Sequence, residues 1–413
     1  MKMDLVRRIR SEFSFLTGNY LLLVITWFIM DIFNEIPSNF FSLYVLELGG
    51  TVFGIGLIGF FARIAFAMVS IPGGYIADKY GRKKILVLAT LGMSFNYLVL
   101  AFAPDWRFLL LALIIGNFLR IANPALHAIT ADSLPPGKRG LGYSIYQLTI
   151  DLSSTPAPLV AAFLFARLGF VPGMRIAYVF VSLAYFAATL IRLRLKETIE
   201  HVEAVNIREL LLAFPLSIKE ILRTIYEIPS SLRYLILSYN IFSFAGSMYG
   251  SYVVIYAIAD LGLSKSQWAV VLTIQALFTT LLILPVGKVI DMYGGKKMMI
   301  LFNVLMIMGL ISIAYGNYNV LYLSMPLLGI SWSSSNAVRR KLTADLTARK
   351  MRGKINGLIR FTTLIVGSVG SLIGGYVYEN SAHVNIFLIS ICVSTVGMLI
   401  FARLVQEPEV EEI

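Results

Sequence analysis

The sequence predicts an all-α integral membrane protein with twelve transmembrane helices arranged as two parallel six-helix repeats. The prediction depends on composition, on the number of long apolar segments and on an internal repeat. Hydrophobic residues make up 58% of the 413 residues and charged residues only 14%, against about 45–50% and about 25% in soluble domains. So few charges cannot cover a water-exposed surface, which excludes a soluble globular protein.

Twelve segments are long and apolar enough to span a membrane, because a bilayer core of about 30 Å needs roughly 20 apolar residues of helix. They are residues 18–46, 52–77, 84–103, 107–131, 141–166, 174–194, 234–259, 266–290, 297–316, 319–338, 356–378 and 384–404. Barrel strands are shorter and alternate in polarity. We therefore expect one helix for each span.

The basic residues are distributed unevenly between the two sets of loops. The chain has a net charge of +12, and most loop lysines and arginines lie in the N-terminal tail and the even-numbered loops. The odd-numbered loops contain only Arg107, Arg167, Arg175 and Lys265. Because basic loops stay in the cytoplasm, we expect a multi-pass plasma-membrane protein with both termini cytoplasmic. The positive charge therefore indicates topology, and we expect no nucleic acid partner.

Three regions follow from the spans. We expect an N-terminal six-helix bundle over residues 1–194, a cytoplasmic linker over 195–233, and a C-terminal six-helix bundle with an acidic tail over 234–413. Apolar residues recur at helical spacing between Ile207 and Ile225 of the linker, which predicts a helix on the inner membrane surface. A plain linker is the alternative.

An internal repeat relates the two bundles at an offset of 213 residues. Three separated motifs align at this offset. GYIADKYGRKK from Gly74 aligns with GKVIDMYGGKK from Gly287, and APLVAA at 157–162 aligns with GSLIGG at 370–375. Asn123 aligns with Asn336, and a Thr-Ala-Asp sequence follows each of them. An offset containing six spans preserves membrane orientation. The halves are therefore parallel repeats about an axis along the membrane normal.

The loop between the second and third spans resembles the signature Gly-x-x-x-Asp-x-x-Gly-Arg-Lys of the major facilitator superfamily. The matching residues are Gly74, Asp78, Gly81, Arg82 and Lys83, with Asp291 and Gly294 in the second half. Span count, linker and repeat extend the resemblance over essentially the whole chain. It implies that Asp78 and Arg82 help hold an outward-facing state by contacts across the halves. Simple anchoring of the basic residues is the alternative.

The glycines of this loop motif have physical roles that do not depend on the family. Gly74 allows neighbouring helices to approach closely. Gly81 permits a tight turn with positive φ.

Five ionisable residues lie inside predicted spans of the first half: Asp31, Glu35, Arg63, Arg120 and Asp151. Each costs at least about 2.5 kcal/mol on insertion scales, so each needs a functional or structural reason. Asp31 and Glu35 are four residues apart and share a helix face. The equivalent second-half positions are uncharged.

We interpret these charges as a proton-coupling site. Asp31 is the first choice for the titrating group and Glu35 the second, with Arg120 as the modulating partner. The resemblance supports this choice, because drug–proton antiporters of the superfamily often have an acidic residue in span one and an arginine in span four. The alternative is a static ion network that fixes helix packing, and Arg63 with Asp151 is a candidate structural pair.

Polar and aromatic residues of both halves are candidates for a substrate cavity. They are Asn123, Tyr146, Tyr239, Asn240, Gln275, Trp332 and Asn336. The APLVAA segment resembles the Gly-Pro-x-x-Gly-Gly motif of antiporters in the family, with alanines in place of the glycines. We expect Pro158 to kink the fifth span.

The sequence therefore predicts a proton-coupled secondary active transporter that exports a small amphipathic or hydrophobic solute by alternating access. Proton-coupled nutrient uptake and uncoupled facilitation are the alternatives. We expect a monomer whose partners are a small-molecule substrate, protons and the lipid bilayer. With three histidines and one cysteine, we expect no metal site, no cofactor and no enzymatic activity.

Overall fold

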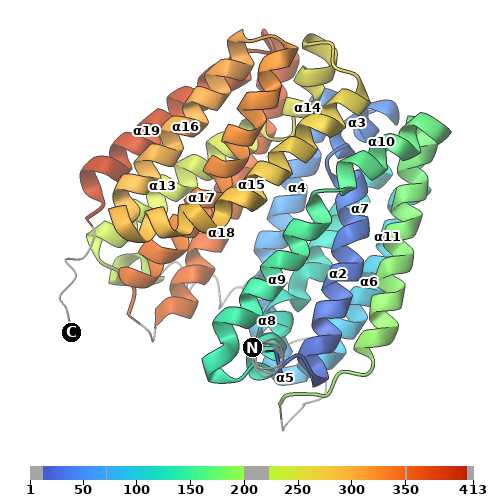
Figure 1. The fold of residues 1–413 in the computed structure, drawn as a ribbon, viewed down its shortest axis with the longest axis vertical. Helices are drawn as coiled ribbons and strands as arrows, with labels where there is room; N and C mark the ends of the chain where they lie inside the picture. Colours follow the sequence, from blue (N-terminus) through green and yellow to red (C-terminus); the bar gives the residue numbers. More distant parts are fainter. Residues whose placement is uncertain (1–12, 71, 200–222, 349–350, 407–413) are drawn as a thin grey trace, which may run out of the picture.

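A computed structural model describes residues 13–70, 72–199, 223–348 and 351–406, and its regular structure there is entirely helical. The two halves of the chain form two bundles that stand side by side (Figure 1). The N-terminal tail, the acidic C-terminal tail and most of the predicted linker helix lie outside the described residues.

The first bundle contains six spans, of which three are interrupted. Its helices are α2 (Gly18–Ser38), α3 (Phe41–Glu47), α4 (Val52–Ser70), α5 (Pro72–Tyr80), α6 (Arg82–Ala101), α7 (Trp106–Leu119), the 3₁₀ turn η1 (Arg120–Ala122), α8 (Asn123–Asp132), η2 (Pro136–Lys138), α9 (Arg139–Ser154), α10 (Ala157–Leu168) and α11 (Phe170–Arg192). The fifth span breaks between α9 and α10, where Pro156 precedes α10 and Pro158 lies in its first turn.

The second bundle repeats this order with longer helices. They are α13 (Ser230–Tyr249), α14 (Val253–Ile255), the π-turn η3 (Tyr256–Asp260), α15 (Lys265–Tyr293), α16 (Gly295–Tyr315), η4 (Tyr318–Val320), α17 (Leu321–Asp345), α18 (Arg352–Asn380) and α19 (Asn385–Leu404). Ser264 caps α15 through a capping box with Gln267, which fixes where this helix begins.

Helix boundaries confirm the repeat. The helices α15, α16 and α18 begin at residues 265, 295 and 352, each 213 residues after the starts of α4, α6 and α9 at 52, 82 and 139. One predicted span is wrong in detail: the first, expected to run over 18–46, ends at Ser38, and α3 follows as a separate helix.

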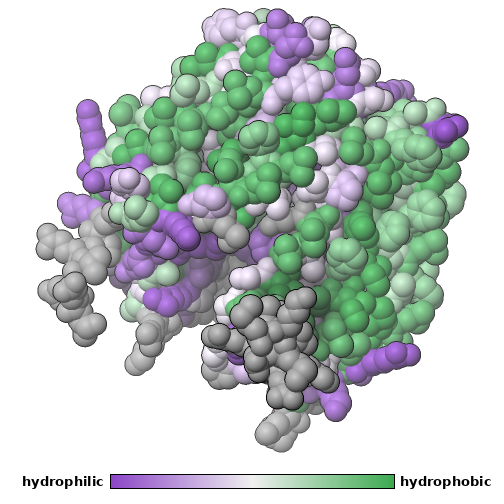
Figure 2. Space-filling view, in the orientation of Figure 1, coloured by the Kyte–Doolittle hydropathy of each residue, from purple (hydrophilic) through white to green (hydrophobic). Residues whose placement is uncertain are grey.

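Eleven helices in the described part of the chain are long and apolar enough to cross a membrane. The tenth predicted span is the exception. Its helix α17 is 25 residues long, but it contains the polar runs SWSSSN and RRK. Apolar side chains cover the flank of the molecule in Figure 2, and many are exposed, such as Phe163 and Leu281. The chain is therefore a multi-pass membrane protein.

The buried apolar residues form three clusters with different memberships. One cluster contains residues of both halves, such as Tyr44 and Tyr252. Each half has a further cluster of its own, one around Leu23 and one around Leu235. We call the end with the common cluster the shared end. We call the other end, where the loop motifs lie, the basic end.

Small residues let the two halves touch directly at the shared end. A Cβ built on Gly375 of α18 would lie 3.3 Å from the Cα of Gly56 and 3.2 Å from the Cα of Phe53, both on α4. The backbone N–H of Phe53 donates to Glu379 Oε2, and Lys265 Nζ lies 3.0 Å from Glu47 Oε1. The halves are therefore in backbone contact here, with polar contacts around that contact.

Candidate functional site

Two connected chambers lie between the halves. The deep chamber has a volume of about 690 Å³ and the basic chamber a volume of about 1010 Å³. Both are lined by Arg63, Ser243 and Trp332, so they meet at these residues. Together the chambers form a path from the shared end to the basic end.

The deep chamber carries one acid and one base. Glu35 of α2 and Arg63 of α4 line it from the first half, and Gln275 and Trp268 of α15 line it from the second. No other Asp, Glu, Lys, Arg or His side chain contributes to its described lining. Glu35 therefore reaches the space between the halves, where water or a solute can contact it.

The basic chamber is lined by cations. Its wall contains the five arginines Arg63, Arg339, Arg340, Arg352 and Arg360, together with His127. Within its described lining there is no carboxylate. Arg340, Arg352 and His127 are exposed, so the chamber is open to the surface. Hydrophilic residues border the hollow between the halves in the lower part of Figure 2.

The structure separates the two predicted coupling carboxylates. Glu35 lies on the deep-chamber wall, whereas Asp31, one turn earlier on α2, is not among the described lining residues of either chamber. Asp31 is half-buried and close enough to Arg192, Tyr146 and Tyr185 to interact electrostatically. Asp31 is therefore directed into the first bundle.

The other predicted charges are also divided. Arg63 lines both chambers. Arg120 begins η1, and its guanidinium carbon lies 5.1 Å from the ring centroid of Phe66. Asp151 lies on α9, and its side chain is outside what the structure describes, so its pairing with Arg63 stays a prediction.

Four of the seven predicted cavity residues line a chamber. Trp332 lines both, Gln275 lines the deep chamber, and Tyr239 and Asn336 line the basic chamber. The other three are elsewhere: Tyr146 packs on Trp27 at 4.5 Å between ring centroids, Asn240 has a buried amide oxygen without a hydrogen-bond partner, and Asn123 begins α8.

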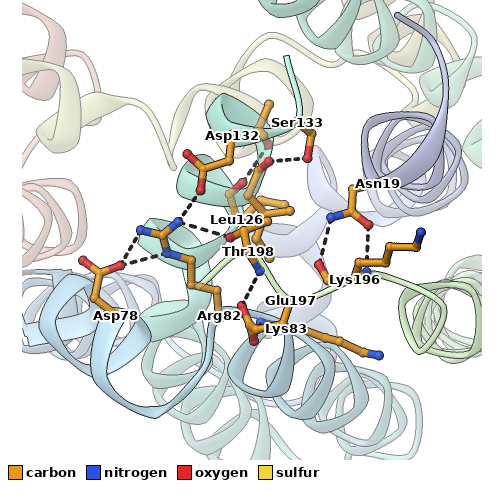
Figure 3. Close-up of polar contacts among 12 residues, drawn as sticks. Asn19, Asp78, Arg82, Lys83, Leu126, Asp132, Ser133, Lys196, Glu197 and Thr198 are labelled. Atoms are coloured by element: carbon orange, nitrogen blue, oxygen red, sulfur yellow. Dashed lines mark hydrogen bonds and ion pairs between the residues drawn. The ribbon is translucent and has the colours of Figure 1, made fainter. Parts of the chain in front are cut away.

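The first-half loop motif forms a compact polar network (Figure 3). Arg82 Nη2 lies 2.7 Å from Asp78 Oδ1, and its Nη1 lies 2.5 Å from Asp132 Oδ2 and 3.2 Å from the Thr198 hydroxyl. The backbone N–H of Lys83 donates to Glu197. All these partners belong to the first half or to the start of the linker. Within the described residues, Asp78 and Arg82 form no ion pair across the halves in this conformation.

The second-half copy of the network is smaller. Asp291 pairs with Lys341 at 3.1 Å, and 78% of the Asp291 side chain is exposed. This difference matches the sequence, where Gly295 stands at the position equivalent to Arg82.

The glycines of the motif differ in what they do. Gly81 has φ of 94° and Gly294 has φ of 85°, which confirms the tight turn with positive φ. The close approach expected at Gly74 is instead at Gly73, because a Cβ on Gly73 would lie 2.5 Å from Ile121 O. A Cβ on Gly74 would make only an ordinary contact with Pro124.

The described residues contain no group of three or more side chains suited to a metal ion. The chambers offer charged and polar groups for a solute or a proton.

Comparison with known proteins identifies the family. A sequence model described as Major Facilitator Superfamily matches residues 13–232 and 235–413. The chain belongs to the major facilitator superfamily. Its fold is the superfamily's twelve-helix fold in two six-helix repeats.

Curated relatives are transporters at low identity. An uncharacterized MFS-type transporter of Methanocaldococcus jannaschii is 23% identical over 398 residues, 93% of this chain and 94% of that protein. A Na(+), Li(+), K(+)/H(+) antiporter of Planococcus maritimus is 30% identical over 136 residues, 30% of this chain and 31% of that protein. The multidrug resistance protein MdtG of Proteus mirabilis is 27% identical over 186 residues, 43% of this chain and 46% of that protein.

Solved structures share the superfamily fold. A mutant of the nucleoside transporter NupG superposes with a TM-score of 0.73 at 15% identity, covering 94% of this chain and 100% of that chain. The human organic anion transporter MFSD10 superposes with a TM-score of 0.65 at 18% identity, covering 93% of this chain and 100% of that chain. These likenesses show the fold alone.

Within this superfamily fold, sequence reasoning missed the second-half arginines. Arg339 and Arg340 follow the predicted end of span ten at 338, but α17 continues to Asp345. Arg360 lies only four residues into predicted span eleven, but α18 begins at Arg352, so Arg360 is roughly 12 Å along the helix. The sequence signal that could have revealed them is that no helix-breaking residue separates the apolar part of span ten from Arg339.

Arg192 was also missed. It is 3% exposed near the end of α11 and donates to the hydroxyls of Thr90 at 2.6 Å and Thr26 at 3.2 Å. Its proximity to Asp31 makes it the principal cation near that carboxylate within the first bundle.

Proposed function

We propose that this superfamily member is a proton-coupled transporter that exports a small amphipathic solute by alternating access. The observation that supports it most is the deep chamber, where Glu35 and Arg63 reach the space between the halves. A carboxylate that meets water from one side at a time can gain and lose a proton as the halves move. The residues of the basic end are rich in Lys and Arg, which favours a cytoplasmic position for that end.

In this proposal the described conformation faces the cytoplasm. The halves are in backbone contact at the shared end and have separate cores at the basic end, with the larger chamber between them. A solute then enters the basic chamber from the cytoplasm and leaves after the shared end opens. The printed names of the antiporter and multidrug relatives favour this direction and mechanism.

Two carboxylates share the coupling role in this proposal. Glu35 exchanges the proton with the chamber, and Asp31, on the same helix face, responds to it because the two carboxylates interact. Arg192 supplies positive charge beside Asp31 in the interior of the first bundle. Asp31 and Arg192 thereby connect the deep chamber to the interior of the first bundle.

Transport by purified protein in liposomes tests this proposal. Asp31→Asn and Glu35→Gln should each abolish accumulation driven by a pH gradient and leave solute exchange intact, because the carboxylate is needed only to carry the proton. Glu227→Gln is the matched control, since Glu227 forms only an exposed ion pair with Arg223. Normal gradient-driven transport by both variants would contradict the assignment.

A further inference from the structure

The basic chamber carries more positive charge than its surroundings balance. In the part of the chain that the structure describes, no ion pair involves Arg63, Arg339, Arg340 or Arg360. The fifth arginine is occupied differently: Arg352 donates to the carbonyls of Ala344 and Thr347 at the end of α17. Four guanidinium groups therefore face the chamber without a carboxylate partner among the described side chains, which do not include that of Asp151.

Anchoring at the membrane surface does not explain the deepest of these charges. Arg63 lies 11 residues into α4 and Arg360 lies 8 residues into α18, roughly 16 Å and 12 Å from the helix starts. A Cβ on Gly367 of α18 would lie 3.4 Å from Arg63 Nη1, so Arg63 reaches the opposite half. Cations at such depth are costly unless something compensates them.

Two arginines from opposite halves meet at one aromatic ring. Arg360 of the second half lies 4.6 Å from the ring centroid of Phe66, and Arg120 of the first half lies 5.1 Å from it. The two guanidinium groups are close enough to repel each other. This repulsion acts across the space that must narrow when the basic end closes.

The rest of the wall suits an apolar body. Trp332, Phe242, Met299 and Met306 line the basic chamber, and 57% of Trp332 is exposed between the halves. Tyr239 is 4% exposed, and its hydroxyl has no hydrogen-bond partner among the described residues. The apolar and aromatic side chains therefore give the basic chamber a surface on which an apolar body can pack.

We propose, building on the proposed transport function, that the substrate is a small organic anion with a carboxylate or phosphate head and an apolar or aromatic body. The head binds between the guanidinium groups of Arg63 and Arg360, with Arg339 beside it. Guanidinium–oxyanion hydrogen bonds are strong and directional. The body packs on Trp332 and Phe242.

The same anion controls closure of the basic end. Without it, Arg360 faces Arg120 across the narrowing space, and the repulsion between these two guanidinium groups holds the halves apart. With it, the negative charge of the head balances them, so the closed state becomes accessible. A neutral solute of the same shape binds less tightly and does not favour closure.

Ligand-induced thermal stabilisation of the purified protein tests the substrate class. The probes are benzoate and phenylphosphonate, with benzamide as the neutral match and benzylammonium as the cationic match. We expect the two anions to raise the unfolding temperature and to change Trp332 fluorescence, and the other two to do neither. Trp332→Phe should remove the fluorescence change.

Charge-neutralising variants test the residues. Arg360→Gln and Arg339→Gln should each weaken benzoate binding about tenfold or more, the usual effect of losing a hydrogen bond to a charged group. Arg403→Gln, an equal charge change at an exposed position on α19 outside both chamber linings, should bind like the unaltered protein. If Arg403→Gln weakens binding equally, only net charge matters and the proposed site is wrong.

The outcomes separate this inference from the transport proposal. Stabilisation by benzylammonium or benzamide but not by either anion, up to millimolar concentration, would overturn the anion site and leave proton-coupled transport standing. So would a panel in which no anion has an effect. Anion binding that depends on Arg360, combined with flux indifferent to a pH gradient, would support the anion site and overturn the coupling.

Discussion

The two ends of this transporter hold its halves in opposite ways. At the shared end, α4 and α18 approach to backbone contact at Gly56 and Gly375, and one apolar cluster joins the halves. At the basic end each half has its own apolar cluster, and a chamber lined by arginines lies between them. Close packing therefore stabilises contact at one end, while like charge opposes it at the other.

This difference indicates where a small substitution should strongly change the contact between the halves. Packing energies are short-ranged, so an added methyl group at the shared end acts directly on the contact between the halves. Charges act over longer distances and respond to a solute. In the anion proposal, a ligand bound at the basic end therefore adjusts the balance between the two ends.

The largest effect is expected from Gly375→Ala. The new methyl group would lie 2.8 Å from the Tyr252 hydroxyl of its own half, and 3.2 and 3.3 Å from the Cα atoms of Phe53 and Gly56, which cannot shift easily. Overpacking of this kind costs about 1–3 kcal/mol. The population with a closed shared end should fall about tenfold or more. Spin labels at Gly137→Cys and Gly353→Cys, one on each half at the basic end, should then report a shorter distance, in a Cys392→Ser background.

Gly287→Ala is the control for this substitution. A Cβ at Gly287 has nothing within 4 Å, so the spin-label distances should not change. If Gly375→Ala and Gly287→Ala give the same distance distribution, the glycine contact is not what closes the shared end.

An intermediate effect is expected from Arg82→Gln compared with Lys341→Gln. Arg82 is 15% exposed and binds two carboxylates and Thr198. Lys341 pairs with the exposed Asp291 and donates a long hydrogen bond of 3.5 Å to the Ile290 carbonyl. Arg82→Gln should cost about 1–2 kcal/mol and Lys341→Gln less than about 1 kcal/mol. The thermal unfolding midpoint in detergent measures both. An equal or larger loss of stability for Lys341→Gln would contradict the conclusion that the first-half loop network is stronger than the second-half pair.

The smallest effect is expected from Lys265→Gln. The ammonium pairs with Glu47 across the halves and lies 3.7 Å from the ring centroid of Phe170, but partly exposed pairs contribute only about 0.2–1 kcal/mol. The spin-label distribution should shift about fivefold in population at most, because 1 kcal/mol corresponds to a factor of about five. Glu47→Gln should give a similar shift, and the double variant should add little. Additive effects would show that the two side chains act independently.

Sequence reasoning predicted the architecture because it depends on local, periodic signals. Apolar length sets the spans, and the common offset of Val52 and Lys265, or Arg139 and Arg352, follows from duplicated sequence. The break after Ser38 was missed, because apolar residues continue through Phe41 and Val45 while the chain changes direction.

The site was predicted only in part, since facing depends on packing between segments distant in sequence. Glu35 and Arg63 line a chamber, but Asp31, on the same helix face, lies beside Arg192, 161 residues later. Depth counted from an apolar boundary also placed Arg360 near the surface, although polar residues before that boundary belong to the same helix.

The start of the linker has a mechanical consequence for any movement of the bundles. Asn19 exchanges two hydrogen bonds of 2.8 Å with the Lys196 backbone, and Glu197 and Thr198 are bound to Lys83 and Arg82. Residues 196–198 must therefore travel with the first bundle as one body. When the separation of the bundles changes, the part of the linker that is bound to Asn19, Arg82 and Lys83 stays with the first bundle.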